Sequence, residues 1–358
     1  MLFDAGPDLS LVGASITKLF TASAALRVLG PDARFRTTVR ADPPVDGVLT
    51  GDLWLVGGGD PVLGTNAWAA SLPAAARVHT SLETLADRVV AAGVRRVAGR
   101  IIGDESRYDA NRLVPSMPAR LIADGEIGPL SALSVNDGFR VSGHPGVPFT
   151  DPPADAAAVF ARLLSERGVT AGGSGAGEAF NGPAELAAVD SPPIGELVHA
   201  MLRDSDNGTA ELLVKELGVR RFGSGSTSAG ARAMGDTARS ARVRLRGLAL
   251  ADGSGLGDAN RVTCEALTSL LVHDSGLLAT RLPVAAVDGT LRNRFKFAPG
   301  AIRGKTGSLD GVAALAGYAQ APDGGTIQFA YVVNGLANAS SGRALQDQVA
   351  AAVVSATG

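Results

Sequence analysis

The sequence predicts a mixed α/β fold in which both ends of the chain form one domain and a second domain is inserted between them. Helical spacing of apolar residues dominates near the N-terminus and again after residue 190, whereas short strands with glycine-rich turns fill the region between. Near the C-terminus, VAALAGYAQ and TIQFAYVVN are joined by APDGG, which predicts an antiparallel hairpin. We therefore expect an antiparallel sheet flanked by helices from residues 1–39 and 190–358, and a strand-rich inserted domain from residues 40–189.

The individual elements follow from the same patterns. Apolar residues recur at helical spacing from Ser15 to Leu29, and Gly30-Pro31 ends this helix. In the inserted region, the sequence predicts strands in FRTTVRADP, GVLTGDLWLVGGGDP and RVAGRIIGDES, helices in SLETLADRVVAAGV and AAAVFARLLSERGV, and a loop in TAGGSGAGEAFNGP. Toward the C-terminus it predicts helices in PIGELVHAMLRDSDNGTAELLVKELG, around a short loop, and in TSAGARAMGDTARSARVRL and GRALQDQVAAAVVSA.

The composition of the chain limits the classes of partner and site that can be expected. With 358 residues, of which 46% are hydrophobic and 19% charged, the chain can bury a sizeable core. A net charge of −2 gives no electrostatic reason to expect nucleic acid or an anionic membrane surface as a partner. The single cysteine, Cys264, excludes an internal disulfide and a thiolate metal cluster, and the four histidines lack ligand spacing. We therefore expect no metal site built from cysteine or histidine.

Lysine is scarce, since only Lys18, Lys215, Lys296 and Lys305 stand among 33 basic residues. A desolvated lysine can lose its proton, whereas arginine stays charged, so a scarce lysine is a candidate titratable group. In SITK, Ser15 and Lys18 are three residues apart and share a face of the predicted helix. Ser15 at the helix N-terminus would be a nucleophile whose proton a buried Lys18 accepts. The alternative is a helix-capping serine followed by a solvated lysine.

Two further motifs carry reactive side chains. DSDNG places Ser205 and Asn207 between predicted helices, where a hydroxyl can relay a proton and an amide can bind a substrate amide, unless both simply form a turn. In RGKTGS, Lys305 and its hydroxyl neighbours can form an anion pocket, and Gly307 lets a substrate backbone approach, unless this is an ordinary strand start. A phosphate-binding loop is excluded, because Pro299 occupies the required upstream glycine position.

The order of the three motifs, serine–lysine, then SDN, then KTG, resembles the signature of penicillin-binding proteins and serine β-lactamases. The segments GDLWLVGGGDPVL, PLSALSVNDG, ADGSGLGDANRVT and LPVAAVDGTLRNRF are similar to the D-Ala-D-Ala carboxypeptidases of the DacB, or penicillin-binding protein 4, family (peptidase family S13). This likeness covers nearly the whole chain. It implies a β-lactamase/transpeptidase-like domain with an insertion between the first two motifs. The implied substrate is a peptidoglycan stem peptide ending in D-Ala-D-Ala, cleaved without a metal or cofactor, and the implied inhibitors are β-lactam antibiotics.

The resemblance also implies a role for each motif residue. Ser15 would be the acylated nucleophile and Lys18 its general base. Ser205 would pass a proton to the departing D-alanine, and Asn207 would hold the amide on the acyl side. Lys305 would support Ser205 electrostatically.

The KTG motif would bind the end of the peptide. By the resemblance, Lys305 binds the terminal carboxylate together with Thr306 and Ser308, and Gly307 leaves room for the substrate backbone. The oxyanion hole would consist of the backbone N–H groups of Ser15 and Ser308. Loss of one such donor would raise the barrier by about 3 kcal/mol.

Two positions are candidates for recognition of the peptide's diamino acid. In the family an acidic residue of the inserted region reaches this side chain, and GDESRYD makes Asp104 the candidate, against the alternative of a solvated surface charge. After DGSGL the family commonly has Ser-Arg, where this chain has Gly257-Asp258. Arg261 is the alternative source of the arginine contact.

The N-terminus departs from the family pattern. Relatives carry a signal peptide and one or two strands before the first motif, whereas 14 residues precede Ser15 here, which implies a shortened start. The sequence contains neither a signal-peptide pattern nor an apolar run long enough to span a membrane. Because peptidoglycan lies outside the cytoplasmic membrane, we expect an extracytoplasmic location.

Three functional hypotheses remain at this point. The leading one is a serine-type D-Ala-D-Ala carboxypeptidase, with DD-endopeptidase activity as an open addition. A β-lactamase or esterase on the same fold is disfavoured by the large insertion and by the lack of an E-x-x-L-N run. A non-catalytic cell-wall scaffold is disfavoured because the serines, lysines and asparagine of all three motifs are intact.

Overall fold

The computed structural model describes residues 3–73, 78–141, 146–179 and 183–356. The chain divides into two compact units. The terminal unit contains Met1–Pro31, Ile194–Gly223 and Thr227–Gly358, and the inserted unit contains Asp32–Pro193 and Ser224–Ser226. The predicted boundaries at 39/40 and 189/190 would each cut a strand, because β1 (Arg36–Arg40) and β12 (Glu185–Asp190) pair with each other inside the inserted unit.

A central helix organises the terminal unit. Helix α1 (Lys18–Val28) is buried from Lys18 to Leu26 and contacts α6 (Ile194–Asp204), α7 (Asn207–Phe222) and α8 (Thr227–Ser240). A buried helix has no solvated polar face, and the polar side chains Lys18, Thr21 and Ser23 are hydrogen-bonded inside the core instead. The predicted helix start at Ser15 is wrong by one turn, because residues Ala14–Thr17 form a separate 3₁₀ turn, η1.

The antiparallel sheet of the terminal unit has the order β13-β14-β15, with β13 at Ile302–Leu309, β14 at Val312–Gln320 and β15 at Thr326–Asn334. The predicted hairpin is confirmed as β14 and β15. Leu315 packs in one core cluster with Ala350 of α11 (Ala339–Ser355), while the Tyr318 hydroxyl donates to the carbonyl of Leu271 in α9 (Cys264–His273). Odd and even positions of β14 therefore face different helices. Shorter elements are α10 (Ser275–Leu278), η4 (Ala279–Arg281) and η5 (Gly289–Leu291).

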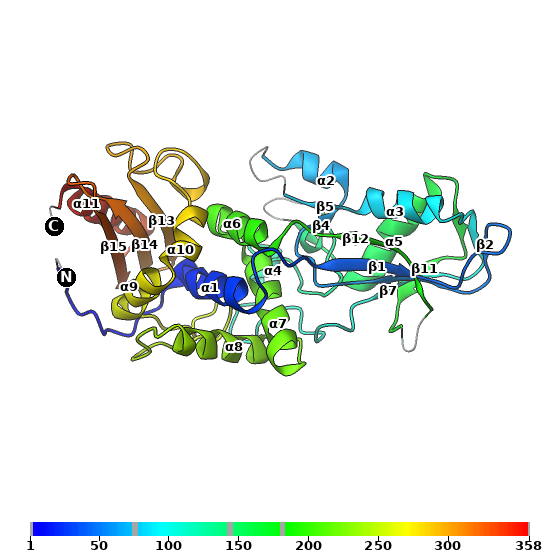
Figure 1. Ribbon diagram of the computed structural model, residues 1–358, viewed down its shortest axis with the longest axis horizontal. Coiled ribbons are helices and arrows are strands. Elements are labelled where there is room, and N and C mark those ends of the chain that lie inside the picture. The colour runs from blue at the N-terminus through cyan, green and yellow to red at the C-terminus, as the bar shows by residue number, and fades with distance from the viewer. Residues whose placement is uncertain (1–2, 74–77, 142–145, 180–182, 357–358) are drawn as a thin grey trace. The chain divides into compact units, whose positions relative to one another are not determined.

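The inserted unit is built on a mixed sheet in the order β11-β7-β3-β1-β12. Strands β3 (Leu53–Val56), β7 (Ile101–Asp104) and β11 (Ser174–Ala176) are mutually parallel, whereas β1 is antiparallel to both its neighbours. Helices α3 (Leu82–Ala91) and α5 (Pro152–Ser165) contact each other and this sheet (Figure 1). The hydrophobic core of the inserted unit lies between these two helices and the sheet. The remaining short elements are β2 (Val48–Leu49), β4 (Leu63–Gly64), α2 (Asn66–Ser71), β5 (Thr80–Ser81), β6 (Arg96–Val97), α4 (Arg120–Ala123), η3 (Asn136–Gly138), β8 (Phe139–Val141), β9 (Val147–Pro148) and β10 (Thr170–Ala171).

The predicted loop in TAGGSGAGEAFNGP contains strand structure. Strand β10 pairs in parallel with β6, and β11 pairs in parallel with β7. The prediction failed because small and glycine residues have low strand propensity, and only pairing with a neighbouring strand stabilises them here. Residues 180–182 of the same stretch lie outside the described residues.

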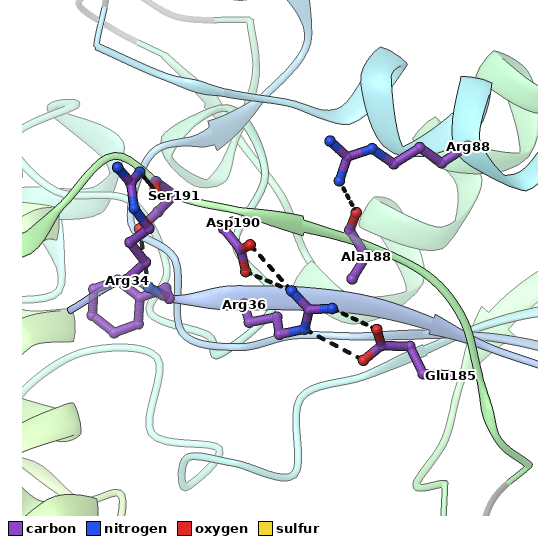
Figure 2. A network of polar contacts seen from close by, with 8 residues as sticks. Arg34, Arg36, Arg88, Glu185, Ala188, Asp190 and Ser191 are labelled. Atoms are coloured by element: carbon purple, nitrogen blue, oxygen red, sulfur yellow. Dashed lines mark hydrogen bonds and ion pairs between the residues drawn. The ribbon is translucent and has the colours of Figure 1, made fainter. Parts of the chain in front are cut away.

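An ion-pair network ties β1 to β12. Figure 2 shows the Arg36 guanidinium between the carboxylates of Glu185, at 2.6 Å, and Asp190, at 2.9 Å. Arg36 lies directly opposite Asp190 in the strand register, so the pair reinforces the strands that close the inserted unit. All three side chains are about half exposed, so solvent screening limits the stabilisation they provide.

The mixed α/β fold predicted from the sequence is confirmed. In the described ranges, none of the helices combines the length and the apolar character that crossing a bilayer requires.

Replacing Phe160 by alanine tests the core of the inserted unit. Phe160 is 0% exposed on α5, so Phe160→Ala removes buried apolar area and leaves a cavity. We expect the free energy of unfolding, measured by urea titration, to fall by about 3–5 kcal/mol. Phe3→Ala is the matched control, because Phe3 is 84% exposed and its loss should change stability by less than about 0.5 kcal/mol. Equal effects of the two changes would contradict the assigned core.

Candidate active site

Ser15 lies in the 3₁₀ turn that leads into α1. In such a turn, side chains three residues apart are eclipsed, which brings Ser15 above Lys18, the residue that caps the turn. Ala14, immediately before Ser15, is buried and has a φ of +50°, which is unusual for a residue with a side chain. The turn is thus held in a strained conformation by its surroundings, a feature that clusters at functional sites.

The amine of Lys18 is fully buried and contacts three oxygen atoms. Its Nζ lies 3.0 Å from the Ser15 hydroxyl, 2.6 Å from Asn207 Oδ1 and 2.8 Å from the Ser254 carbonyl. The amide and carbonyl oxygens can only accept hydrogen bonds. When Lys18 is a neutral amine, its two N–H groups therefore go to Asn207 and Ser254, and its lone pair is left to face the Ser15 hydroxyl. This arrangement suits a general base for Ser15.

Ser205 and Lys305 form a second serine–lysine pair. Ser205 lies between α6 and α7 with a φ of +62°, and its hydroxyl accepts a hydrogen bond of 2.9 Å from Lys305 Nζ. The same amine donates to the Thr306 carbonyl at 2.9 Å. Desolvation and, second, the positive charge of Lys18 hold the pKa of the buried Lys305 well below its usual value. When Lys18 is protonated, its charge therefore acts on Lys305, which links the two pairs.

The KTG segment lies on β13, which contacts the turn that carries Ser15. Gly307 is the point of closest approach, because a Cβ there would lie 2.5 Å from the Gly13 carbonyl oxygen. Alternation along the strand places Lys305 and Gly307 on one face and Thr306 and Ser308 on the other. Lys305 is buried, whereas Ser308 is exposed, so the segment presents polar atoms to solvent at this end of the strand.

The structure thus brings together residues from all three motifs within the terminal unit. Hydrogen bonds join Ser15, Lys18 and Asn207, and separately Ser205 and Lys305, while Gly307 packs against the Ser15 turn.

Sequence reasoning missed the segment that completes the Lys18 site. DGSGLG, residues 252–257, supplies the Ser254 carbonyl, and Gly255 adopts a φ of +81° where a Cβ would lie 2.0 Å from the Ala14 carbonyl oxygen. This segment entered the sequence analysis only as part of the family likeness. A backbone carbonyl carries no side-chain signature, and only the run of glycines hinted at a close approach.

Asp104 and Arg261 are held by contacts in their own units. Asp104, at the end of β7, is 3% exposed, and its carboxylate accepts backbone N–H bonds from Ser106 at 2.7 Å and Ala179 at 2.8 Å. These contacts favour a structural role for Asp104, and its predicted contact with substrate stays a prediction. The Arg261 guanidinium donates to the carbonyls of Asp258 and Asn260 in its own loop.

No group of three or more His, Cys, Asp or Glu side chains in the described ranges is arranged to hold a metal ion. The serines, lysines and asparagine given above supply polar side chains to the site.

Comparison with known proteins decides the family. A sequence profile described as "D-Ala-D-Ala carboxypeptidase 3 (S13) family" matches residues 1–146 and 145–355. The chain belongs to this family. A D-alanyl-D-alanine carboxypeptidase of Actinomadura sp. (strain R39) is 30% identical over 95% of this chain and 76% of its own length. Carboxypeptidase DacB of Mycolicibacterium smegmatis is 32% identical over 98% of this chain and 76% of its own length.

A solved structure agrees with this S13 assignment at the level of the fold. Penicillin binding protein 4 (dacB) from Haemophilus influenzae matches with a TM-score of 0.81 at 20% identity, covering 98% of this chain and 93% of that one. A second structure of the same protein, complexed with a β-lactam, matches with a TM-score of 0.75 at 22% identity, over 99% of this chain and 93% of that one. The resemblance to the S13 carboxypeptidases inferred from the sequence is confirmed.

Replacing Gly307 by alanine tests the contact between β13 and the Ser15 turn. The added Cβ would meet the Gly13 carbonyl oxygen at 2.5 Å, so strand or turn must shift. We expect Gly307→Ala to lower the free energy of unfolding by about 1–3 kcal/mol in urea titrations. The control, Gly235→Ala on α8, adds a Cβ with no described atom within 4 Å and should be neutral or stabilising. A neutral Gly307→Ala would contradict the close approach.

The lowered pKa of Lys305 predicts a pH dependence of stability. An unfolded chain keeps this lysine protonated up to about its ordinary value of 10.5, whereas the folded chain releases the proton at lower pH. Between these two values the unfolded state binds more protons, so folding becomes more favourable as the pH rises. Relative to Lys305→Met, the unchanged chain should therefore gain stability as the pH is raised toward 10.5, measured by urea titration. Lys296→Met deletes an exposed ammonium as the matched control. The lowered pKa of Lys305 would be contradicted if the stability of the unchanged chain relative to Lys305→Met decreased as the pH rose.

Proposed function

We propose that the chain is a serine-type D-Ala-D-Ala carboxypeptidase that acts on peptidoglycan stem peptides through an acyl-enzyme on Ser15. The observation that carries this proposal is the Lys18 amine, buried and 3.0 Å from the Ser15 hydroxyl, with two acceptor oxygens occupying its other directions. Membership of the S13 family supports the reaction class.

Acylation follows from this geometry. The Lys18 lone pair takes the Ser15 proton while Oγ attacks the carbonyl carbon of the penultimate D-alanine. Backbone N–H groups of Ser15 and Ser308 stabilise the oxyanion, as the family resemblance implies. The C–N bond then breaks, and the Ser205 hydroxyl gives a proton to the leaving nitrogen. Ser205 recovers a proton from the protonated Lys18, which becomes neutral again, while Lys305 holds the Ser205 hydroxyl through their hydrogen bond, so the net transfer is from Ser15 to D-alanine.

Deacylation returns the enzyme to its starting state. Water attacks the ester carbonyl, Lys18 again serves as the base, and Ser15 regains its proton as the shortened peptide leaves. A β-lactam would acylate Ser15 in the same way, but its leaving nitrogen stays tethered to the acyl group and can obstruct the attack of water. A long-lived adduct is therefore expected.

Substrate binding divides between the motifs. Asn207 would use its amide N–H to bind the carbonyl on the acyl side, because its Oδ1 is engaged by Lys18 at 2.6 Å. Lys305, Thr306 and Ser308 would bind the terminal carboxylate, and the exposed Ser308 supports access by a ligand. Asp104 and Arg261 are the candidates that the sequence offers for recognition of the diamino acid.

The proposed substrate sets the location. Peptidoglycan is assembled outside the cytoplasmic membrane, so a protein that trims it acts in the periplasm-like space or the cell wall. We include this extracytoplasmic location in the proposal.

A labelled penicillin tests the proposed function directly. Intact-mass measurement should find one adduct per chain, and peptide mapping should place it on Ser15. Ser15→Ala should abolish both the adduct and the release of D-alanine from a peptide ending in D-Ala-D-Ala. Ser10→Ala is the control, since the Ser10 hydroxyl only donates to the Gly247 carbonyl, and it should react normally.

Other outcomes of this experiment identify the competing functions. Rapid release of hydrolysed penicillin, with no D-alanine released from the peptide, would mean a β-lactamase. Absence of both an adduct and D-alanine release from a folded protein would mean a non-catalytic protein. Cleavage of a cross-linked peptide dimer would add endopeptidase activity.

A further inference from the structure

Two buried acidic residues hold the segment that supplies the third contact of Lys18. The Glu211 Oε1 atom accepts the N–H groups of Gly253, at 3.0 Å, and Ser254, at 2.7 Å. The Asp252 carboxylate accepts those of Gly255, at 2.7 Å, and Gly257, at 2.9 Å. Both side chains are 0% exposed. The backbone of residues 252–257 is therefore fixed on one side by two carboxyl groups.

The carbonyl groups of the same segment are bound by α1. The Thr21 hydroxyl donates to the Gly253 carbonyl at 2.7 Å, and Lys18 Nζ donates to the Ser254 carbonyl at 2.8 Å. Ser254 is thus bound at its N–H by Glu211 and at its C=O by Lys18. A shift of Glu211 changes the position of Ser254, and Ser254 in turn determines where one N–H of the lysine amine points.

Orientation matters because the amine can rotate about its last carbon–carbon and carbon–nitrogen bonds. Two fixed acceptors leave a neutral amine one arrangement in which its lone pair faces Ser15. Without the Ser254 carbonyl in place, the amine would lose one of these two acceptors and could turn an N–H toward Ser15 and point its lone pair elsewhere. Misplacement of a catalytic group by about 1 Å can cost about a hundredfold in rate.

We infer that Glu211 is a positioning residue for the acylation of Ser15, because it fixes the Ser254 carbonyl as the acceptor that orients the Lys18 amine. This inference rests on the proposed function. Glu211 touches neither Ser15 nor the expected substrate, and it acts through Ser254 and Lys18 alone.

The hydrogen bonds and the pKa of Glu211 indicate which property of its side chain is needed. Within the described part of the chain its Oε2 atom is buried without a hydrogen-bond partner, so one oxygen does all the bonding. Burial, followed by the charge of Asp252, raises the pKa of Glu211 to about 7, while bonds from Ser254 and Gly253 act in the opposite direction. Near neutral pH the group is therefore partly a neutral acid. The needed feature is an acceptor oxygen at this distance, and a glutamine supplies one.

The experiment compares Glu211→Met with Glu211→Gln. Methionine has a similar length but no strong acceptor, whereas glutamine keeps an oxygen at the same distance along the side chain. Stopped-flow measurement with a labelled penicillin separates non-covalent binding from acylation. We expect Glu211→Met to lower the acylation rate by roughly tenfold to a hundredfold with little change in binding, and Glu211→Gln to stay close to the unchanged chain.

Hydrogen exchange followed by mass spectrometry gives a readout that does not depend on catalysis. Amides of residues 252–257 should exchange faster in Glu211→Met than in the unchanged chain, but not in Glu211→Gln. Tyr318→Phe is the matched control for loss of one buried hydrogen bond in the same unit, since its hydroxyl donates to the Leu271 carbonyl at 2.8 Å. That variant should lose stability without loss of acylation rate.

Several results would overturn the inference. The inference would be overturned if a folded Glu211→Met were acylated at the normal rate. It would also be overturned if Glu211→Gln were acylated as slowly as Glu211→Met, or if Tyr318→Phe were acylated slowly. If Glu211→Met does not fold, Glu211→Asp replaces it, since the shorter acid cannot reach both N–H groups, and normal acylation there is equally decisive. If the unchanged chain forms no adduct, the proposed function fails and the inference fails with it, whereas slow variants of an active chain test Glu211 alone.

Discussion

The buried amine of Lys18 is the constraint on which the rest of the terminal unit depends. An amine with no exposed surface needs hydrogen-bond partners, because burying a polar nitrogen without them costs several kcal/mol. Those partners come from the turn before α1, from the start of α7 and from residues 252–257. Segments far apart in the sequence must therefore meet around the Nζ atom of Lys18. The fold of the terminal unit brings these segments together.

Packing around α1 follows from that requirement. The helix is enclosed by α6, α7 and α8, so its side chains are buried from Lys18 to Leu26. The sheet approaches the Ser15 turn through Gly307, and the 252–257 segment approaches it through Gly255, at distances that a side chain would not permit. Glycines are placed at the points where the three segments come closest. Stability of the core and geometry of the site are thus properties of the same contacts.

The buried lysines and acids inside this core are stabilised by pairing and by changes in their protonation. Lys18 and Lys305 are both fully buried, and the charge of Lys18 helps to lower the pKa of Lys305. Glu211 and Asp252 are also buried and near each other, and both have raised pKa values chiefly because of desolvation. Perturbed groups of both signs concentrated in one region are typical of catalytic sites. The Arg36 network of the inserted unit differs, since it lies at the surface and acts between strands.

By itself the sequence determined the fold class, most helices and strands, and the residues of the three motifs, because periodicity and short motifs are local properties of the chain. Tertiary structure alone decided the remaining features. Ser15 lies in a 3₁₀ turn rather than in α1, residues 170–171 and 174–176 form strands in a glycine-rich stretch, and the domain boundaries avoid the β1–β12 pair. It also decided that a Ser254 carbonyl held by Glu211 completes the Lys18 site. Backbone groups are the same in every residue, so their partners depend on how distant segments pack, which no local pattern records.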